Sequence, residues 1–314
     1  MNKLAIIKSF QDKKVLLVGD TILDAYIYGR KVGKDLDCPS VPQVKEIDVF
    51  RTFGGASLVA ANMLELGAHV FFVSVVGADK NAEHYNAFSH PKLRKFLVID
   101  ERRKTTTKSR IFVNGKKMLW LNQVTDGEIE SEIEKKVFSA VKLLAKKVDI
   151  MVVADNQHGL LTENLIKQLI RLSHKTGKPL YVDSQIGYKP GKHLLYRGAD
   201  CLFLNRREAQ FVDRNIDIKK IKDKLGVSNV IIKLGAKGAA ALFNGELVES
   251  VPYRVRVVDP CGAGDAFLSA FSLGDRQSPK ESLNIANIWA ALSVTIQGTE
   301  PPKKQDLINV INDK

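Results

Sequence analysis

The chain has 314 residues, of which 45% are hydrophobic, so it can bury one large core in one or two domains. Lysine and arginine (48) outnumber aspartate and glutamate (35), and the net charge of +13 favours anionic partners without selecting one. The three cysteines, Cys38, Cys201 and Cys261, form neither a CxxC pair nor a zinc spacing. This argues against a disulfide framework or a metal knuckle and predicts a reduced, cytoplasmic setting.

The sequence offers no membrane or nucleic-acid signal. The N-terminus lacks a signal-peptide core, and apolar runs such as residues 15–19 are too short to cross a bilayer. Zinc-finger spacing, RNP-type aromatic motifs and basic regions followed by heptads do not occur, and the lysines are spread along the chain. We therefore expect no membrane and no nucleic-acid partner. Nucleic-acid binding is the alternative explanation of the charge, and it predicts affinity that falls steeply with salt.

Short apolar runs alternate with helix-length amphipathic stretches, which predicts a doubly wound α/β fold with a mainly parallel sheet between helices. Helix ends support this: Thr162 can cap the segment ENLIKQLI, and Gly177 and Pro179 can close it. In chain order, we expect strands at 14–19, 69–76, 149–154, 180–183, 201–204 and 230–234, and helices at 56–66, 128–147, 162–176 and 263–273.

Two segments interrupt this alternation, at about 25–53 and 97–123. In the second, FLVIDERR, TTKSRIFVNGKK and MLWLNQV alternate like antiparallel strands, with Asn114-Gly115 as a turn. Strands inserted away from a parallel sheet commonly form a lid or a dimer surface. We expect residues 1–314 to form one domain with a small β-strand lid from these segments, and a homodimer through that lid.

The segment VDPCGAGDAF, residues 258–267, stands directly before an apolar helix. Gly262 and Gly264 let backbone amides approach a phosphate, and the helix N-terminus adds positive charge. An acidic Asp265 beside such a cradle is electrostatically costly unless it accepts a proton from an attacking hydroxyl. We predict Asp265 as the catalytic base and Gly262, Ala263 and Gly264 as the cradle. The alternative is a glycine turn that Asp265 simply caps.

This segment resembles the C-terminal signature of the ribokinase-like (PfkB) carbohydrate kinases, and GGA from Gly54, with Asn62, resembles their N-terminal signature. The resemblance spans nearly the whole chain. It implies the ribokinase-like fold and transfer of the γ-phosphoryl group of ATP to a sugar or sugar-phosphate hydroxyl, with Mg²⁺ and with K⁺ as a candidate monovalent cation. Further segments follow in family order: GDTILD from Gly19, NRRE from Asn205, KLGAKG from Lys233, Ala286-Asn287 and Gly298-Thr299.

The resemblance also implies an acceptor site. Asp24 would hydrogen-bond sugar hydroxyls, and a turn-capping aspartate is the alternative. Gly54 and Gly55 would let the backbone press against the sugar, or else they only initiate a helix. Lys108 and Arg110 alternate along a lid strand and could both reach an anionic substrate, although surface charge explains them equally well. The predicted substrate contacts are Asp24, Gly54, Gly55, Lys108, Arg110 and Asp259.

A nucleotide site is implied in the same way. Asn205 and Glu208 would organise Mg²⁺, Glu208 through water, and an ordinary N-cap with a first-turn glutamate is the alternative. Lys233 would lie along ATP, although a solvated lysine at a strand end is common. The predicted nucleotide contacts are Asn205, Glu208, Lys233, Gly235, Gly238 and Asn287.

Within the family, GDTILDAYIYG, CPSVPQV, GGASLVAANMLELGA and TTTKSR resemble the kinase domain that phosphorylates O1 of D-glycero-D-manno-heptose 7-phosphate, in heptose precursor synthesis. Three departures fall in the expected acceptor pocket: Leu58 replaces an asparagine, Trp120-Leu121-Asn122 replaces Arg-x-Asp, and DNQHG at 155–159 replaces Asp-Tyr-x-Lys-Gly. His158 could meet a substrate phosphate or could be structural. Another sugar or small alcohol as acceptor, and an inactive ligand-binding or scaffold protein, therefore stay open.

Overall fold

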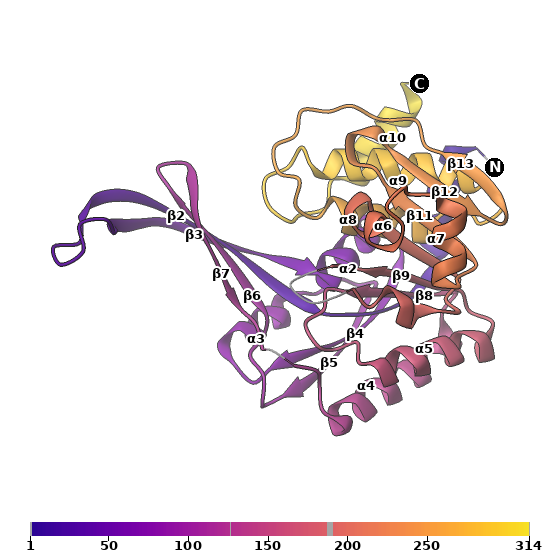
Figure 1. Cartoon of the computed structure of the whole chain (residues 1–314), viewed down its shortest axis with the longest axis horizontal. Coiled ribbons are helices and arrows are strands. Elements are labelled where there is room, and N and C mark those ends of the chain that lie inside the picture. The colour runs from indigo at the N-terminus through magenta and orange to yellow at the C-terminus, as the bar shows by residue number, and fades with distance from the viewer. Residues whose placement is uncertain (1, 126, 187–190, 314) are drawn as a thin grey trace.

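The computed structural model describes residues 2–125, 127–186 and 191–313. Figure 1 shows helices packed around a central sheet, and a long ribbon of strands that projects from this body. The sheet has nine strands in the order β13-β12-β11-β10-β9-β8-β1-β4-β5, and its neighbours pair in parallel except where β12 and β13 join antiparallel. The strands are β1 (Lys14–Gly19), β4 (His69–Gly77), β5 (Leu93–Asp100), β8 (Ile150–Asp155), β9 (Leu180–Ser184), β10 (Cys201–Asn205), β11 (Asn229–Lys233), β12 (Ala239–Phe243) and β13 (Glu246–Glu249).

The central strands are buried on both faces, as β1 shows. Val15 and Leu17 pack into one hydrophobic core, whereas Leu16 and Val18 pack into another. Because alternate side chains of a strand point to opposite faces, a strand covered on both sides is apolar throughout. The first core is covered by α1 (Lys3–Ser9), α2 (Ala56–Glu65), α3 (Lys80–Ala87), α8 (Ala263–Leu273), α9 (Pro279–Ser293) and α10 (Lys304–Asn312). The second is covered by α4 (Ser131–Leu144), α5 (Glu163–Thr176), α6 (Arg206–Val212) and α7 (Ile218–Leu225).

The predicted doubly wound α/β fold is confirmed, and the predicted helix ends are confirmed at α5. The Thr162 side chain accepts a hydrogen bond from the Leu165 amide at 3.0 Å, and Gly177 closes the helix in the left-handed conformation. The helix expected at 128–147 begins three residues later, as α4, because Glu130 is extended and forms its N-cap, while Ile129 before it packs into the core.

A second, four-stranded sheet forms the projecting ribbon, with the order β3-β2-β6-β7. We call it the lid sheet. The turn between β6 and β7 lies at Asn114 and Gly115, whose φ angles of 48° and 77° are those of a tight hairpin, as predicted. Its strands are β2 (Thr21–Lys34), β3 (Pro42–Gly55), β6 (Thr107–Val113) and β7 (Lys116–Gln123).

One predicted lid strand belongs elsewhere. The segment FLVIDERR was expected to pair antiparallel within the lid, but residues 96–100 lie in β5, which pairs in parallel with β4 in the central sheet. The prediction was wrong because β5 is an edge strand with several half-buried and exposed positions. Partial exposure of this kind resembles the polar alternation of an antiparallel strand.

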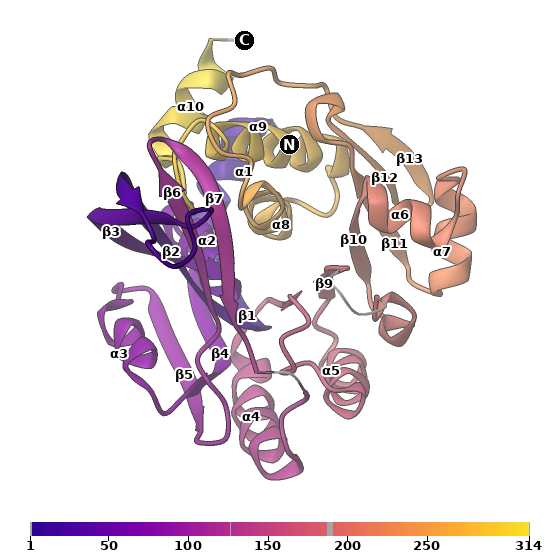
Figure 2. The ribbon, with the colours of Figure 1, turned by 60° about the vertical axis from the view of Figure 1, so that its left-hand side comes forward.

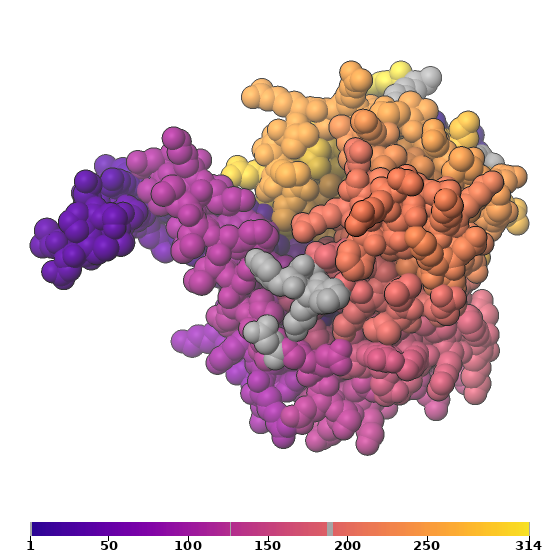
Figure 3. Space-filling model, viewed as in Figure 1, coloured from indigo at the N-terminus to yellow at the C-terminus, as the bar shows by residue number. Residues whose placement is uncertain are grey.

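The lid sheet and the strands β10 to β12 flank α8. In the view of Figure 2, the lid strands lie on one side of α8, and β10 to β12 lie on the other. The space-filling view in Figure 3 shows the tip of β2 and β3 reaching well beyond the body. Among the residues that the structure describes, no helix is both long enough and apolar enough to cross a membrane.

Candidate active site

The carboxyl ends of the parallel strands form one edge of the central sheet, and the predicted functional residues gather there. In the central sheet, β4 pairs with one side of β1, and β8, which comes later in the chain, pairs with the other side. Ligands bind in open α/β sheets at such a point of reversal. Asp20 follows β1 and Asn156 follows β8 at this position, while β9, β10 and β11 end beside them.

A cavity of about 910 Å³ lies at the ends of β9, β10 and β11. This volume is within the usual range of small-molecule sites. Tyr253 and Arg254, from the irregular segment that precedes α8, form part of its wall. All of the predicted nucleotide contacts and two residues of the predicted cradle line it: Asn205, Glu208, Lys233, Gly235, Gly238, Asn287, Ala263 and Gly264.

A cluster of charged groups lies at one end of this cavity. Lys233 forms an ion pair with Asp183, which lies next to the last residue of β9 and which the sequence analysis did not single out. Burial alone would lower the pKa of Lys233, but Asp183 and Glu208 outweigh burial and raise it. Burial, followed by the charge of Asp183, raises the pKa of Glu208 to about 7. The charge of Asp183 therefore acts on both Lys233 and Glu208, and the charge of Glu208 acts on Lys233.

Asn205 and Glu208 form a capping box at the start of α6. The Asn205 side chain accepts a hydrogen bond from the Glu208 amide at 2.9 Å, and the Glu208 side chain accepts one from the Asn205 amide at 2.6 Å. The capping alternative is thus present in the structure. It does not exclude a ligand role, because the same two residues line the cavity.

The predicted cradle is a glycine turn at the start of a helix. Gly262 has φ +83° and is the N-cap of α8, a position where a helix presents its free amides. A Cβ at Gly262 would lie 2.5 Å from the Leu58 side chain, and a Cβ at Gly264 would lie 3.3 Å from Nζ of Lys233. The cradle therefore touches the charged cluster on one side and α2 on the other.

Asp265 lies in the first turn of α8, between two groups of charges. Burial, followed by the charge of Asp183, raises its pKa to about 7, and Lys233 counteracts this. Asp24 and Lys108, on the lid sheet, act on the same carboxyl group. Asp265 thus lies within electrostatic range of both the Asp183–Lys233 pair and the lid.

Asp24 and Arg110 form a buried ion pair on the lid face. Nη1 of Arg110 donates to Oδ1 of Asp24 at 2.6 Å, and the Thr299 hydroxyl donates to Oδ2 at 3.2 Å. Nη2 of Arg110 lies 3.3 Å from Sγ of Cys261, so the arginine links the lid to the turn before α8. Burial lowers the pKa of the neighbouring Lys108, an effect that Asp24 opposes.

Asp259 stabilises the turn before α8 through hydrogen bonds to backbone amides. Its Oδ1 accepts from the Cys261 amide at 3.0 Å, and its Oδ2 accepts from the Gly298 amide at 3.2 Å. Both carboxylate oxygens therefore bind backbone, and Asp259 joins the cradle to the loop after α9.

Gly54 packs closely against β2, and Gly55 packs against Asp20, the residue that follows β1. A side chain at Gly54 would overlap the Asp24 carboxylate. At Gly55, which has φ +56°, a Cβ would lie 2.7 Å from the Asp20 carbonyl oxygen and 3.0 Å from Oδ1 of Asn156. The glycine pair is therefore required for close approach of backbone and polar side chains.

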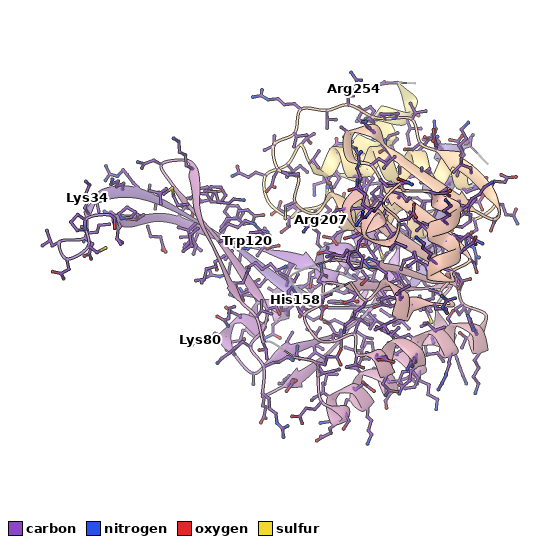
Figure 4. All side chains as sticks on the ribbon, viewed as in Figure 1. Lys34, Lys80, Trp120, His158, Arg207 and Arg254 are labelled. Atoms are coloured by element: carbon purple, nitrogen blue, oxygen red, sulfur yellow. The ribbon has the colours of Figure 1, made fainter. Side chains whose placement is uncertain are left out.

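The three departures from the heptose kinase pattern lie around these groups. Leu58 is 2% exposed and packs beneath Gly262. On the lid face, Asn122 stands opposite Lys108, and Trp120 stands opposite Arg110. Figure 4 labels Trp120 near the junction of the lid and the body.

Sequence reasoning missed Asp183 and Asn156 as site residues. Asp183 is the acidic last residue of the strand expected at 180–183, beside strands that end in Asn205 and Lys233. That position was the available signal, since neighbouring parallel strands share one carboxyl edge. Asn156 was noted only as a departure. By contrast, Asn62, noted with the N-terminal signature, accepts from the Trp289 indole at 2.8 Å and is structural.

A family model described as "pfkB family carbohydrate kinase" matches residues 12–306. The chain belongs to this family. The resemblance seen in the sequence is thereby confirmed, and the protein is a carbohydrate kinase, a phosphotransferase with an alcohol group as acceptor.

Curated relatives are identical to this kinase at between a quarter and a third of the aligned residues. It is 28% identical over 295 residues to "Bifunctional protein HldE" of a Nitratiruptor species, covering 90% of this chain and 61% of that protein. It is 27% identical over 313 residues to the protein of the same name from Helicobacter pylori, covering 96% and 66%. The kinase thus spans less than two thirds of the length of these relatives.

Solved structures share the fold at lower sequence identity. A putative ribokinase from Agrobacterium tumefaciens superposes with a TM-score of 0.76 at 15% identity, covering 96% of this chain and 98% of that one. Escherichia coli phosphofructokinase-2 in complex with potassium gives 0.76 at 16%, with coverage of 96% and 98%. Arabidopsis thaliana ribokinase complexed with ribose and ATP gives 0.72 at 18%, with coverage of 95% and 98%. The ribokinase-like architecture is therefore confirmed.

Proposed function

We propose that this kinase transfers the γ-phosphoryl group of ATP to a hydroxyl of a sugar phosphate, with Asp265 as general base. The preferred acceptor is O1 of D-glycero-D-manno-heptose 7-phosphate. The proposal is supported by four sequence segments that resemble the heptose kinases and by relatives named HldE at low identity. The observation that carries the chemistry is the position of Asp265 in the first turn of α8, directly after Ala263 and Gly264, which line the cavity.

In the proposed reaction the acceptor hydroxyl loses its proton to Asp265 while its oxygen forms a bond to the γ-phosphorus. The bond between that phosphorus and the β–γ bridging oxygen breaks, and ADP leaves. A pKa of about 7 lets Asp265 accept the proton near neutral pH and return it to water. The amides at the start of α8 and the Lys233 ammonium group stabilise the negative charge that develops on the transferred group.

The residues around Asp183 fit a hydrated Mg²⁺ ion. Its Oδ1 is buried and accepts no hydrogen bond within residues 2–125, 127–186 and 191–313, and its charge acts on the neighbouring Glu208. The same described residues contain no group of three or more metal-binding side chains. One or two carboxylates beside bound phosphates are typical of Mg²⁺ sites, and the ion would supply charge neutralisation there.

The positive charges on the lid face favour an anionic acceptor. Lys108 and Arg110 lie on the same face of β6, because they are two residues apart, and this face also carries Asp24. Arg110 is already paired with Asp24, whereas no ion pair of Lys108 is found in the part of the chain that the structure describes. A phosphate on the sugar would give the Lys108 ammonium group a partner and offset its burial.

The test is an Asp265→Asn variant. We expect turnover to fall by at least about a hundredfold, while ATP affinity changes little, because the amide keeps the shape of the side chain but cannot accept the proton. ADP release measures turnover, and calorimetric titration with ATP and Mg²⁺ measures binding. Comparable turnover in the variant would contradict the assignment of the base.

The acceptor is identified by screening ADP release over heptose 7-phosphate, fructose 6-phosphate, ribose and fructose, in Na⁺ and in K⁺ buffers. Preference for heptose 7-phosphate supports the proposed acceptor. Preference for another alcohol retains the mechanism and replaces the acceptor. The absence of turnover with all of them, together with ligand binding, would favour the inactive homologue instead.

A further inference from the structure

We propose that Trp120 is a specificity-determining residue of the acceptor site, which fixes the Arg110 guanidinium group and offers its indole surface to the bound sugar. This inference rests on the proposed function. It concerns a position where the heptose kinases carry arginine, so the expected contact belongs to this chain and not to the resemblance.

The strand register places Trp120 on the same face of the lid as the acceptor groups. Across the lid sheet, Asp24 of β2 pairs with Lys108 of β6, which pairs with Asn122 of β7. The next row on this face contains Tyr26, Arg110 and Trp120, since successive side chains on one face are two residues apart. Leu119 and Leu121 point to the opposite face.

Trp120 and Tyr26 hold the guanidinium group of Arg110 from the two neighbouring strands. The Arg110 Cζ atom lies 5.1 Å from the centroid of the Tyr26 ring and 5.4 Å from that of Trp120, both within cation–π range. The same guanidinium group donates to Asp24 and reaches Cys261 beside the cradle. Holding Arg110 in place therefore also holds the link between Asp24 on the lid and Cys261 in the turn before α8.

Part of the Trp120 side chain is also exposed and available to contact a ligand. It is 50% exposed, whereas Arg110 beneath it is 9% exposed. Lys117 approaches the same ring at 5.9 Å, but this lysine is exposed and flexible, so an incoming sugar can displace it. The electron-rich face of an indole attracts the C–H groups of a sugar ring, and aromatic side chains commonly line sites with a few placed polar groups.

A second unused group lies in the same row. The Tyr26 hydroxyl is buried, with the residue 1% exposed, and has no hydrogen-bond partner in the described part of the chain. A buried hydroxyl without a partner is costly, so a polar group of the acceptor or a water molecule is expected to meet it.

The first experiment compares Trp120→Ala, Trp120→Phe and the control Leu247→Ala. Leu247 is a similarly exposed apolar residue, at 57%, on the edge strand β13 far from the lid. With the best acceptor of the screen, we expect Trp120→Ala to raise the acceptor KM roughly three- to thirtyfold, the size of one lost cation–π or stacking contact, with the KM for ATP unchanged within about twofold. Trp120→Phe should recover much of the loss, and Leu247→Ala should resemble the wild type.

The second experiment uses the intrinsic fluorescence of the protein. Of its two tryptophans, Trp289 is fully buried and hydrogen-bonded to Asn62, so Trp120 is the one placed to report on the acceptor. Heptose 7-phosphate should change the emission of the wild type, and the change should vanish in Trp120→Phe. This titration needs no turnover, so it separates the two proposals.

Three results would overturn the inference: an unchanged acceptor KM in Trp120→Ala, an equal rise in both KM values, or an emission change that survives in Trp120→Phe. A KM effect that disappears at high protein concentration, together with altered sedimentation, would assign Trp120 to a subunit interface instead. A wild type that neither turns over nor responds in fluorescence would remove the proposed function and this inference with it.

Discussion

The Asp265 carboxyl group shows how the fold prepares a base. An exposed aspartate is a weak base near neutral pH, with a pKa of 3.8 as the reference value. Burial in the first turn of α8 and the nearby charge of Asp183 disfavour its ionised form and raise the pKa to about 7. The positive Lys233 and Lys108 limit this rise, so the group ionises within the physiological range.

The pH dependence of the reaction follows from this shift. Because Asp265 must be deprotonated to accept a proton, kcat/KM should be low where the group is protonated and should rise as the pH increases through about 7. Glu208, whose pKa is also raised to about 7, changes charge in the same interval and steepens the rise. Initial rates between about pH 5.5 and pH 8.5 measure the profile. A profile that is flat over this interval would contradict a base with the raised pKa.

At the scale of single residues, the sequence predicts groups that stand in compact motifs. Asp265 and its glycines could be found because a helix N-terminus and an acidic group occur within four residues. Asp183 stands in no such motif. Its place near Lys233 depends on the pairing of β9, β10 and β11, and only its position at the end of an expected strand pointed to it. Contacts between strands distant in sequence carry no local signal.

Among the structural elements, the loop after β8 is positioned by one buried carboxylate. Asp20 accepts hydrogen bonds from the amides of Asn156, His158 and Leu160, at 3.0 to 3.2 Å. Its backbone also joins the start of α2, since the Ala56 amide donates to its carbonyl oxygen. A single residue therefore sets the distance between the glycine pair and the loop that carries Asn156.

Replacing Asp20 by alanine should therefore affect both stability and acceptor binding. We expect a loss of about 2–4 kcal/mol in the free energy of unfolding, because buried amides lose their acceptor, and a raised KM for the acceptor but not for ATP. Denaturant titration and steady-state kinetics provide the measurements. Asp217→Ala is the matched control: it removes a carboxylate that caps α7 through two amides, so it should cost about 1 kcal/mol and leave both KM values unchanged. Wild-type acceptor KM in Asp20→Ala would contradict this role.

The sequence predicted an element correctly where local residues define its ends. It failed where only pairing with a distant strand decides which sheet a strand joins. The helix expected at 263–273 coincides with α8, because Gly262 in the left-handed conformation begins it and Gly274 follows it. The strand at 93–100 was placed in the wrong sheet, since its exposure pattern suits either an edge of a parallel sheet or a hairpin. Helix caps are local, whereas strand partners are not.

At the scale of the whole molecule, the lid sheet ends in an apolar edge. Met118, Leu119, Trp120 and Leu121 of β7 are each at least 50% exposed. An exposed apolar edge strand is a ready surface for another chain. We infer that Leu119 and Leu121, on the face away from Arg110, join two copies of the kinase through their lids.

A dimer of this kind makes a simple prediction. The double variant Leu119→Glu and Leu121→Glu should sediment as a monomer, because two buried charges at an interface are strongly unfavourable, while the wild type sediments as a dimer. Analytical ultracentrifugation over a range of protein concentrations distinguishes the two. A wild type that is monomeric at every concentration would disprove the lid dimer.

The two sheets of the kinase can be altered separately. Apart from the loops at the carboxyl edge, the groups proposed to select the alcohol stand on β2, β3, β6 and β7, whereas those proposed to hold the phosphates stand on β9 to β11 and α8. A protein engineer who wished to redirect the enzyme to a new alcohol could therefore randomise the lid sheet and leave the residues proposed to bind the nucleotide unchanged.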